Sequence, residues 1–176
     1  MKFPLTIQQR TNDCGPTCLK MIADFYGLDL GLTYIKRKFK MTKAGVSMLD
    51  IHKAAETIGF ESTGIKINIE QLKKIVQDIP VIFHYNENHF VIIYKAPRPK
   101  KKGQFFVADP AQGLVKYKDE EFLKFWSGYY QQGNSSIKSK ENLYQFEGCC
   151  LLLEPGPSLC KQTRNQIDMK SLPIHI

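Results

Sequence analysis

The order of hydrophobic patterns along the chain constrains the fold most, and this order changes at Pro80. Before Pro80, apolar side chains recur at helical spacing, as they do at Leu19, Ile22, Ala23 and Tyr26. After Pro80, short runs rich in Val, Ile, Phe and Tyr alternate with turn residues, a pattern typical of β-strands. Helices followed by an antiparallel sheet make an α+β fold. We therefore expect N-terminal helices packed on a C-terminal antiparallel sheet.

Start and stop signals place the individual elements. Pro16 suits the first turn of a helix that ends at Gly27. Ser47 and Asp50 resemble a capping box, and Asn68 is a further helix cap. The expected helices cover 16–26, 32–39, 49–58, 69–79 and 119–126. The expected strands cover 81–85, 89–95, 104–109, 114–117 and 148–154, with hairpin turns at 86–88 and 110–113.

Length and composition indicate a single globular domain. A chain of 176 residues with 43% hydrophobic and 24% charged residues has the usual balance of a soluble protein. The segment after Pro155 is rich in proline and scattered charge, so we expect a domain over 1–157 and a linker or tail over 158–176. Polar residues around Gln8 replace the apolar centre of a signal peptide, which favours a cytoplasmic location.

Cysteine usage and charge argue against three other kinds of protein. The five cysteines are an odd number without metal-ligand spacing, so we expect neither a disulfide framework nor a metal site. Cys149 and Cys150 are neighbours in an apolar run and should face opposite sides of a strand. The net charge of +8 is spread along the chain, and no aromatic residue interleaves the basic run at 98–102. We therefore expect no nucleic-acid partner.

Cys14 stands where a polar loop turns into an apolar-periodic helix. The segment 8–19 has the sequence QQRTNDCGPTCL. Free N–H groups and the dipole at a helix N-terminus favour a thiolate, and a nearby basic group favours it further. Gly15 permits another part of the backbone to approach closely beside the sulfur. The position favours Cys14 as a nucleophile, although any cysteine that precedes a helix has the same local setting.

A cysteine nucleophile requires an imidazole within hydrogen-bond reach and an acceptor that orients the imidazole. Of the four histidines, His175 lies in the tail and His52 in an amphipathic helix. His84 and His89 flank the predicted 86–88 turn, and His89 opens a strand. A hairpin histidine without a role is the alternative interpretation of His89.

Asp109 is the best-placed acceptor for His89. It ends the apolar strand at 105–108, so it lies near one edge of the same sheet if the two strands are neighbours. An aspartate before proline is also a common turn starter, which is the structural interpretation of Asp109. Together, Cys14, His89 and Asp109 form a Cys–His–Asp set in the chain order of papain-like peptidases.

At this point the sequence resembles a known family, the bacteriocin-processing peptidases that form the papain-like N-terminal domains of peptidase-containing ABC transporters. The resemblance covers about residues 3–157. It rests on Gln8 with the 13–22 segment DCGPTCLKMI, on 45–47 GVS with the helix that follows, on 88–91 NHFV, on 107–110 VADP and on 151–155 LLLEP.

The resemblance implies a cysteine endopeptidase that needs no cofactor. It implies Cys14 as nucleophile, His89 as general base and acid, Asp109 as the residue that orients His89, and Gln8 as an oxyanion-hole donor. The implied substrate is a secreted, bacteriocin-type precursor, cut after a Gly-Gly pair at the end of a leader that docks as an amphipathic helix. The implied partners are the transmembrane and ATPase parts of an exporter, which are not in this chain, and the implied place is the cytoplasmic face of the inner membrane.

Two other functions use the same residues differently. A docking module holds a leader for an exporter without cutting it, and the complete set of Gln8, Cys14, His89 and Asp109 argues against that alternative. A papain-like acyl transfer to an amine shares the thiolate and the imidazole, and the mass of the product distinguishes it from hydrolysis. The chain is expected to be either an excised domain or a free-standing peptidase that serves a separate exporter.

Overall fold

A computed structural model describes residues 3–40, 42, 45–85, 89–126 and 146–160. Its helices are α1 (Cys14–Phe25), α2 (Leu32–Lys36), α3 (Met48–Ile58), α4 (Ile69–Ile75) and α5 (Asp119–Trp126). Its strands are β1 (Phe60–Asn68), β2 (Val81–Tyr85), β3 (His89–Lys95), β4 (Gln104–Asp109), β5 (Gly113–Lys118) and β6 (Glu147–Pro155). The predicted α+β fold is confirmed. None of the described helices has the length and apolarity that a bilayer-spanning helix requires.

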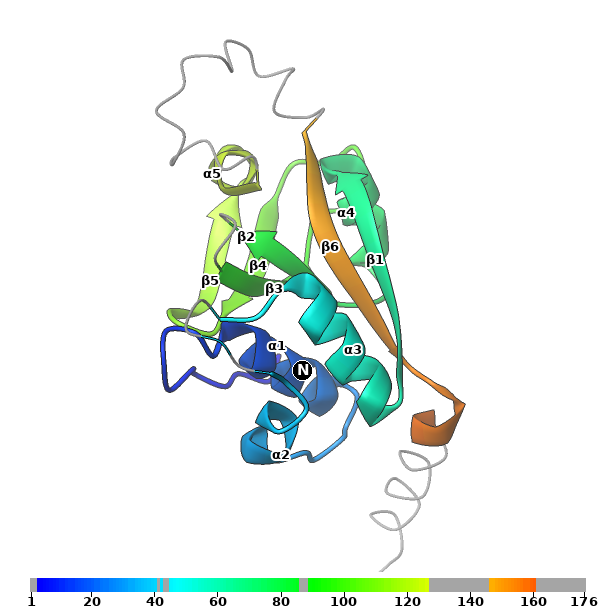
Figure 1. The fold of residues 1–176 in the computed structure, drawn as a ribbon. Helices are drawn as coiled ribbons and strands as arrows, with labels where there is room; N and C mark the ends of the chain where they lie inside the picture. Colours follow the sequence, from blue (N-terminus) through cyan, green and yellow to red (C-terminus); the bar gives the residue numbers. More distant parts are fainter. Residues whose placement is uncertain (1–2, 41, 43–44, 86–88, 127–145, 161–176) are drawn as a thin grey trace, which may run out of the picture.

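The described strands form one antiparallel sheet in the order β1-β6-β2-β3-β4-β5. In Figure 1 the last strand, β6 (orange), lies between β1 and β2. The β2–β3 and β4–β5 pairs are the two predicted hairpins, with Tyr85 opposite His89 and Asp109 opposite Gly113. The order also makes β3 and β4 neighbours, which is the relation that the expected His89–Asp109 pair requires.

Each face of the sheet carries its own apolar core. On one face, Phe90 and Ile92 pack with the buried side chains of α1, α2 and α3. On the other face, Val91 and Ile93 pack with those of α4 and α5. Figure 1 shows α1, α2 and α3 together in the lower half of the view and α5 at the top. Successive residues of β3 therefore alternate between the two cores, as the pleat of a strand requires.

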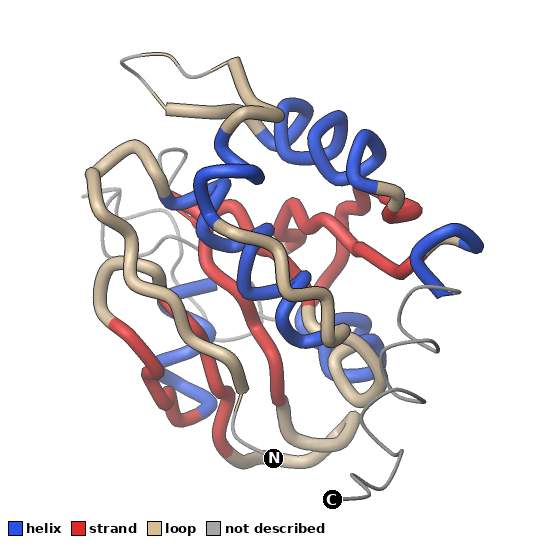
Figure 2. The backbone as a smooth tube through the Cα atoms, turned by 90° about the horizontal axis from the view of Figure 1, so that it is seen from below, coloured by secondary structure: helices blue, strands red, loops and turns tan. Residues whose placement is uncertain are grey.

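The N-terminal segment connects the turn between β4 and β5 to the start of α1. Residues 3–12 contain no helix or strand and lead to the start of α1, along the tan tube that begins near the N label in Figure 2. The ring of Phe3 stacks on Tyr94 of β3 at 4.5 Å between centroids. The N–H of Gln8 donates to the carbonyl of Pro110 at 2.8 Å. Gln8 is thereby fixed beside the turn that joins β4 to β5.

β1 is the strand that the sequence pattern did not reveal. It pairs with β6 from Phe60 opposite Pro155 to Asn68 opposite Glu147. Its sequence, FESTGIKIN, has few apolar residues, because the strand lies at the edge of the sheet and much of its side-chain surface is exposed. Backbone pairing with β6, rather than local hydrophobic alternation, makes this segment a strand.

Two helices are shorter than their apolar patterns predicted. α2 ends at Lys36 rather than at residue 39, and α4 ends at Ile75 rather than at residue 79. The turns that follow still bury Phe39 and Val76. Apolar periodicity reports burial, and a turn that packs on the core continues the pattern after the helical hydrogen bonds have stopped.

Other sequence predictions about local structure are confirmed. Ser47 and Asp50 form a reciprocal capping box, and Gly59 ends α3 at a φ of 111°. Asn68 caps α4. Cys150 is buried and Cys149 is exposed.

The division at residue 157 stays a prediction, because residues 161–176 lie outside the described part. Residues 157–160 form a helical turn, and Leu159 is buried in the core on the α1 side of the sheet. The turn is fixed to the end of α3 by a hydrogen bond from the N–H of Gly156 to the carbonyl of Gly59, at 3.0 Å. Packing against the domain therefore continues at least to Leu159.

Candidate active site

Cys14 lies at the predicted junction of loop and helix, and it is the first residue of α1, which begins two residues before the predicted start at residue 16. Asp13 precedes it at the N-cap position, and the apolar stripe of α1 packs on the sheet. The Cys14 side chain lies in a largely enclosed place, since only 4% of the residue is exposed. A thiol at this position has the unpaired N–H groups of the first helical turn around it.

His89 and Asp109 meet because β3 and β4 are neighbouring antiparallel strands. The ring nitrogen Nε2 of His89 lies 2.8 Å from Oδ1 of Asp109. The same Oδ1 accepts the N–H of Ala111 at 2.7 Å, and Asp109 is only 3% exposed. Since Nε2 serves Asp109, Nδ1 remains for the hydrogen bond between His89 and Cys14. The three predicted residues thus form one hydrogen-bonded chain.

The electrostatics of this chain favour an ion pair. Burial disfavours the Cys14 thiolate, but hydrogen bonds from His89 and from the N–H of Phe90, with the charge of His89 and the N–H of Gly15, lower its pKa below the ordinary value. Burial also disfavours the charged form of His89, but the bonds and charges of Asp109 and Cys14 raise the pKa of His89 to about 9. The two shifts act in the same direction, since both favour a thiolate beside an imidazolium.

Cys18, the second cysteine of α1, does not share the environment of Cys14. Its thiol is fully buried and lies 3.4 Å from the carbonyl of Phe90, to which it donates. Burial, with the charges of Cys14 and Asp109, raises the pKa of Cys18 well above its ordinary value. The peptide groups of Phe90 therefore contact both cysteines, accepting from one and donating to the other. Cys18 is a protonated core residue.

Gln8 lies next to this group with its side chain only weakly engaged. Its Nε2 donates to the carbonyl of Thr11 over a long 3.5 Å, and its buried Oε1 has no hydrogen-bond partner among the described residues. The predicted oxyanion role of Gln8 stays a prediction.

The remaining histidines lie elsewhere. His84 stacks on Phe90 at 4.5 Å between ring centroids, and His52 lies 3.5 Å from Glu56 on α3. His175 is outside the described residues. In the described ranges, no group of three or more His, Cys, Asp and Glu side chains is placed to hold a metal ion.

Gly15 is required for a different reason from the one predicted. The neighbour that approaches it is a side chain, not a backbone: a Cβ at this position would lie 2.4 Å from Cγ2 of Val46 and 3.2 Å from Ile51. Val46 belongs to the segment before α3, and Asn12 donates to the carbonyl of Thr42 in the same region at 3.2 Å. The loop ahead of α3 therefore packs directly against the residue that follows the nucleophile position.

We expect Gly15→Ala to lower the free energy of unfolding by about 1–3 kcal/mol, because the added methyl group must displace Val46 from a packed position. Urea unfolding followed by circular dichroism measures the change. Gly64→Ala on β1 is the matched control, since no atom lies within 4 Å of its Cβ position. An equal loss in both variants would contradict the packing argument.

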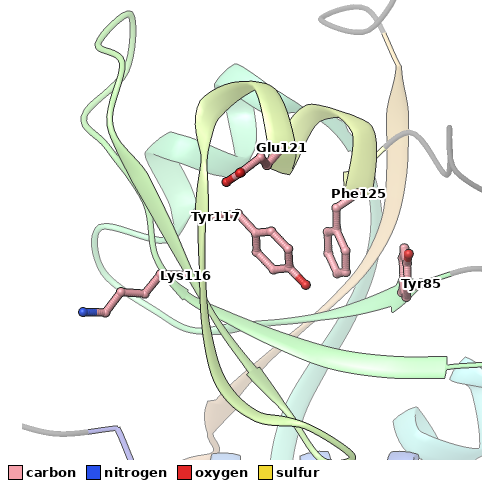
Figure 3. Close-up of a pocket in the computed structure, with 5 residues that line it drawn as sticks. All are labelled: Tyr85, Lys116, Tyr117, Glu121 and Phe125. Atoms are coloured by element: carbon pink, nitrogen blue, oxygen red, sulfur yellow. The ribbon is translucent and has the colours of Figure 1, made fainter.

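A pocket opens on the face of the sheet that carries α5. It has a volume of about 400 Å³ and is lined by Tyr85, Lys116, Tyr117, Glu121 and Phe125. Figure 3 shows the rings of Tyr117, Phe125 and Tyr85 side by side, with Glu121 above them and Lys116 extending away. Phe125 stacks on Tyr85 at 4.1 Å and on Tyr117 at 4.9 Å between centroids.

Two residues that line the pocket are linked to the candidate active site. Tyr85 lies directly opposite His89 in the β2–β3 ladder, so their side chains project from the same face. Burial and the negative charge of Asp109 raise the pKa of Tyr117, which places that hydroxyl within electrostatic reach of Asp109. Sequence reasoning missed these residues. Tyr85, four residues before His89, was the available signal.

The pH dependence of the site follows from the two shifted pKa values. Alkylation of Cys14 requires only the thiolate, so its rate should rise at a pH below the ordinary cysteine range and stay high above pH 9. In the role that the resemblance implies, His89 gives a proton during peptide cleavage, so the cleavage rate should fall as pH rises through about 9. Stopped-flow alkylation with iodoacetamide and a fluorogenic peptide assay give the two profiles. Coinciding profiles at high pH would contradict the assignment of the proton to His89.

Comparison with known proteins agrees with the geometry. Residues 2–136 match the model of the Peptidase C39 family. The chain is 28% identical over 127 residues to the colicin V secretion/processing ATP-binding protein CvaB of Escherichia coli, a match that covers 72% of this chain and 17% of CvaB. It is 30% identical over 125 residues to the lactococcin-G-processing and transport ATP-binding protein LagD of Lactococcus lactis subsp. lactis, covering 69% of this chain and 17% of LagD. The chain thus spans about a sixth of these relatives.

Solved structures share the fold. The double glycine motif protease from an AMS/PCAT transporter, in complex with the leader peptide, is 28% identical with a TM-score of 0.67, covering 88% of this chain and 92% of that chain. The peptidase domain of Streptococcus ComA has a TM-score of 0.64 at 22% identity, covering 88% and 99%. A cysteine, a histidine and an aspartate in one hydrogen-bonded chain on a fold shared with these peptidase domains leave one conclusion. The chain is a cysteine peptidase domain and belongs to the Peptidase C39 family.

Proposed function

We propose that this domain removes the leader of a secreted, bacteriocin-type peptide precursor by cutting after a Gly-Gly pair. The observation that carries the proposal is the hydrogen-bonded chain from Cys14 through His89 to Asp109. The substrate class is supported by the relatives, which are named as secretion and processing proteins, and by the similar protease solved with its leader peptide.

In the proposed reaction the Cys14 thiolate attacks the carbonyl carbon of the second glycine. The oxygen gains negative charge, which Nε2 of Gln8 and the N–H of Cys14 stabilise. His89 gives its proton to the leaving amine, the C–N bond breaks, and a thioester remains on Cys14. Neutral His89 then takes a proton from water, which attacks the thioester and releases the leader. Asp109 holds the ring in the orientation that both steps need.

We propose that apolar side chains of the leader occupy the pocket formed by Tyr85, Tyr117 and Phe125. Tyr85 of this pocket is the cross-strand neighbour of His89, which supports a leader site on the same side of the sheet as the imidazole. An amphipathic helix that lays its apolar face into such a groove is a common recognition mode. The wider partners are then the membrane-spanning and ATPase parts of an exporter, at the cytoplasmic face of the membrane.

The test is mass spectrometry of a synthetic leader–core peptide with a Gly-Gly junction, incubated with the reduced native protein and with Cys14→Ala. A cut after the second glycine by the native protein alone is the expected result. Binding of the peptide without any cut would indicate a docking module and not a leader peptidase. A product joined to an added amine would indicate acyl transfer.

We expect Tyr117→Ala to raise KM for the full-length precursor by about tenfold and to leave kcat within about twofold, because the pocket contacts the leader and not the scissile bond. Tyr34→Ala on α2, an exposed tyrosine outside this pocket, is the control. Initial-rate kinetics on the precursor give both constants. A loss in kcat at unchanged KM would contradict the binding of the leader in this pocket.

A further inference from the structure

The carboxylate of Asp13 is turned away from the helix that it precedes. Aspartate at an N-cap usually accepts the N–H of the second or third helical residue. Here Asp13 makes no such bond, and its Oδ2 lies 2.5 Å from Nζ of Lys36 on α2. The Asp13 side chain is 3% exposed and Lys36 is 24% exposed. This is a buried carboxylate, next to the nucleophile in sequence, whose charge is matched from another helix.

The groups that Asp13 leaves uncapped are the ones that the active site uses. The second helical residue is Gly15, whose N–H is hydrogen-bonded to the Cys14 sulfur. The third is Pro16, which has no N–H to offer. The one N–H within reach of a capping carboxylate is therefore the one that serves the thiolate. A free Asp13 carboxylate would compete for that N–H and would place a second negative charge beside the sulfur.

We propose that Lys36 is a positioning residue for catalysis: it holds the Asp13 carboxylate away from the N-terminus of α1, so that Gly15 N–H and its positive surroundings stay with Cys14. The inference rests on Cys14 as the nucleophile of the proposed function. Lys36 itself contacts neither substrate nor sulfur, and it acts through Asp13.

The charges around Cys14 from the packed elements are few. β3 contributes His89, β4 contributes Asp109, and α1 contributes Cys18, whose thiol is protonated. On α3, Asp50 is bonded to Ser47 in the capping box. The Asp13–Lys36 pair differs from these described groups, because its separation would add a like charge at the start of α1.

The experiment measures the pH midpoint of Cys14 alkylation, together with kcat and KM, in a Cys149→Ser/Cys160→Ser background that removes the exposed thiols. Lys36→Met should move the midpoint upward by about one pH unit, as a like charge near a thiolate does, and lower kcat by up to about tenfold at unchanged KM. Lys36→Arg should keep the native values. Asp13→Ala/Lys36→Met should restore the midpoint, because no carboxylate is left to compete.

Lys20→Met is the matched control. It breaks the pair between Lys20 and Asp24, which has the same 2.5 Å separation but lies further along α1, and it should change neither quantity. If Lys36→Met is not folded at the assay temperature, Lys36→Ala replaces it, since it also removes the group that holds Asp13.

An unchanged midpoint in the folded Lys36 variant would overturn the inference, and so would a double variant that stays as impaired as the single one. The alkylation midpoint requires no cleavage. A native protein that cuts nothing but shows the expected midpoints would therefore refute the proposed function and leave the role of Lys36 intact.

Discussion

Replacing Cys14 with alanine is expected to lower the cleavage rate by about 10⁴-fold or more, because the covalent route disappears with the sulfur. The fold should survive, since the substitution removes one atom at the first turn of α1 and leaves the apolar stripe of that helix in place. Circular dichroism checks the fold, and product formation from the leader–core peptide checks the rate.

The other cysteines provide the comparison for this result. Cys149→Ala and Cys160→Ala change exposed thiols far from the helix start and should leave the rate unchanged. Cleavage that persists in Cys14→Ala, or that is lost equally in Cys149→Ala, would mean that a different residue carries the reaction. Iodoacetamide labelling of the native protein at neutral pH should likewise modify Cys14 far faster than Cys18, whose thiol is buried and protonated.

Replacing His89 with alanine is expected to cost about as much, roughly 10⁴-fold, through two separable effects. The leaving amine loses its proton donor, and the thiol loses the hydrogen bond and the charge that stabilise its anion. With burial left unopposed by His89, the pKa of Cys14 should rise. The cleavage rate and the pH midpoint of Cys14 alkylation are both measured in this variant.

The two effects distinguish His89 from a residue that only supports the fold. His52→Ala on α3 removes a histidine that faces Glu56 and should alter neither quantity. Asp109→Asn leaves Cys14 and His89 in place but should weaken the orientation of the His89 ring. Its alkylation midpoint should lie between those of the native protein and His89→Ala. A His89→Ala protein with a native alkylation midpoint would contradict the ion pair.

The sequence by itself determined the elements and the candidate site residues that follow from local pattern. Cys14 could be found because a polar loop, a glycine and an apolar helical stripe meet there. His89 and Asp109 could be found because each marks the end of a short apolar strand, and antiparallel neighbours bring strand ends together. The capping residues Ser47 and Asn68 act within a few positions of themselves, so their pattern needs no tertiary information.

Only the tertiary structure decided the features that depend on which distant segments lie side by side. β1 is a strand because β6, far along the chain, pairs with it. Gly15 is constrained by Val46, and Tyr85 shares a pocket with Tyr117 and Phe125, through packing that local spacing does not encode. The Asp13–Lys36 pair belongs to the same class. Hydrophobic periodicity tells which face of an element is buried. The partner of that face is set by the packing of the whole chain. This packing also determines the charge and the shape around Cys14.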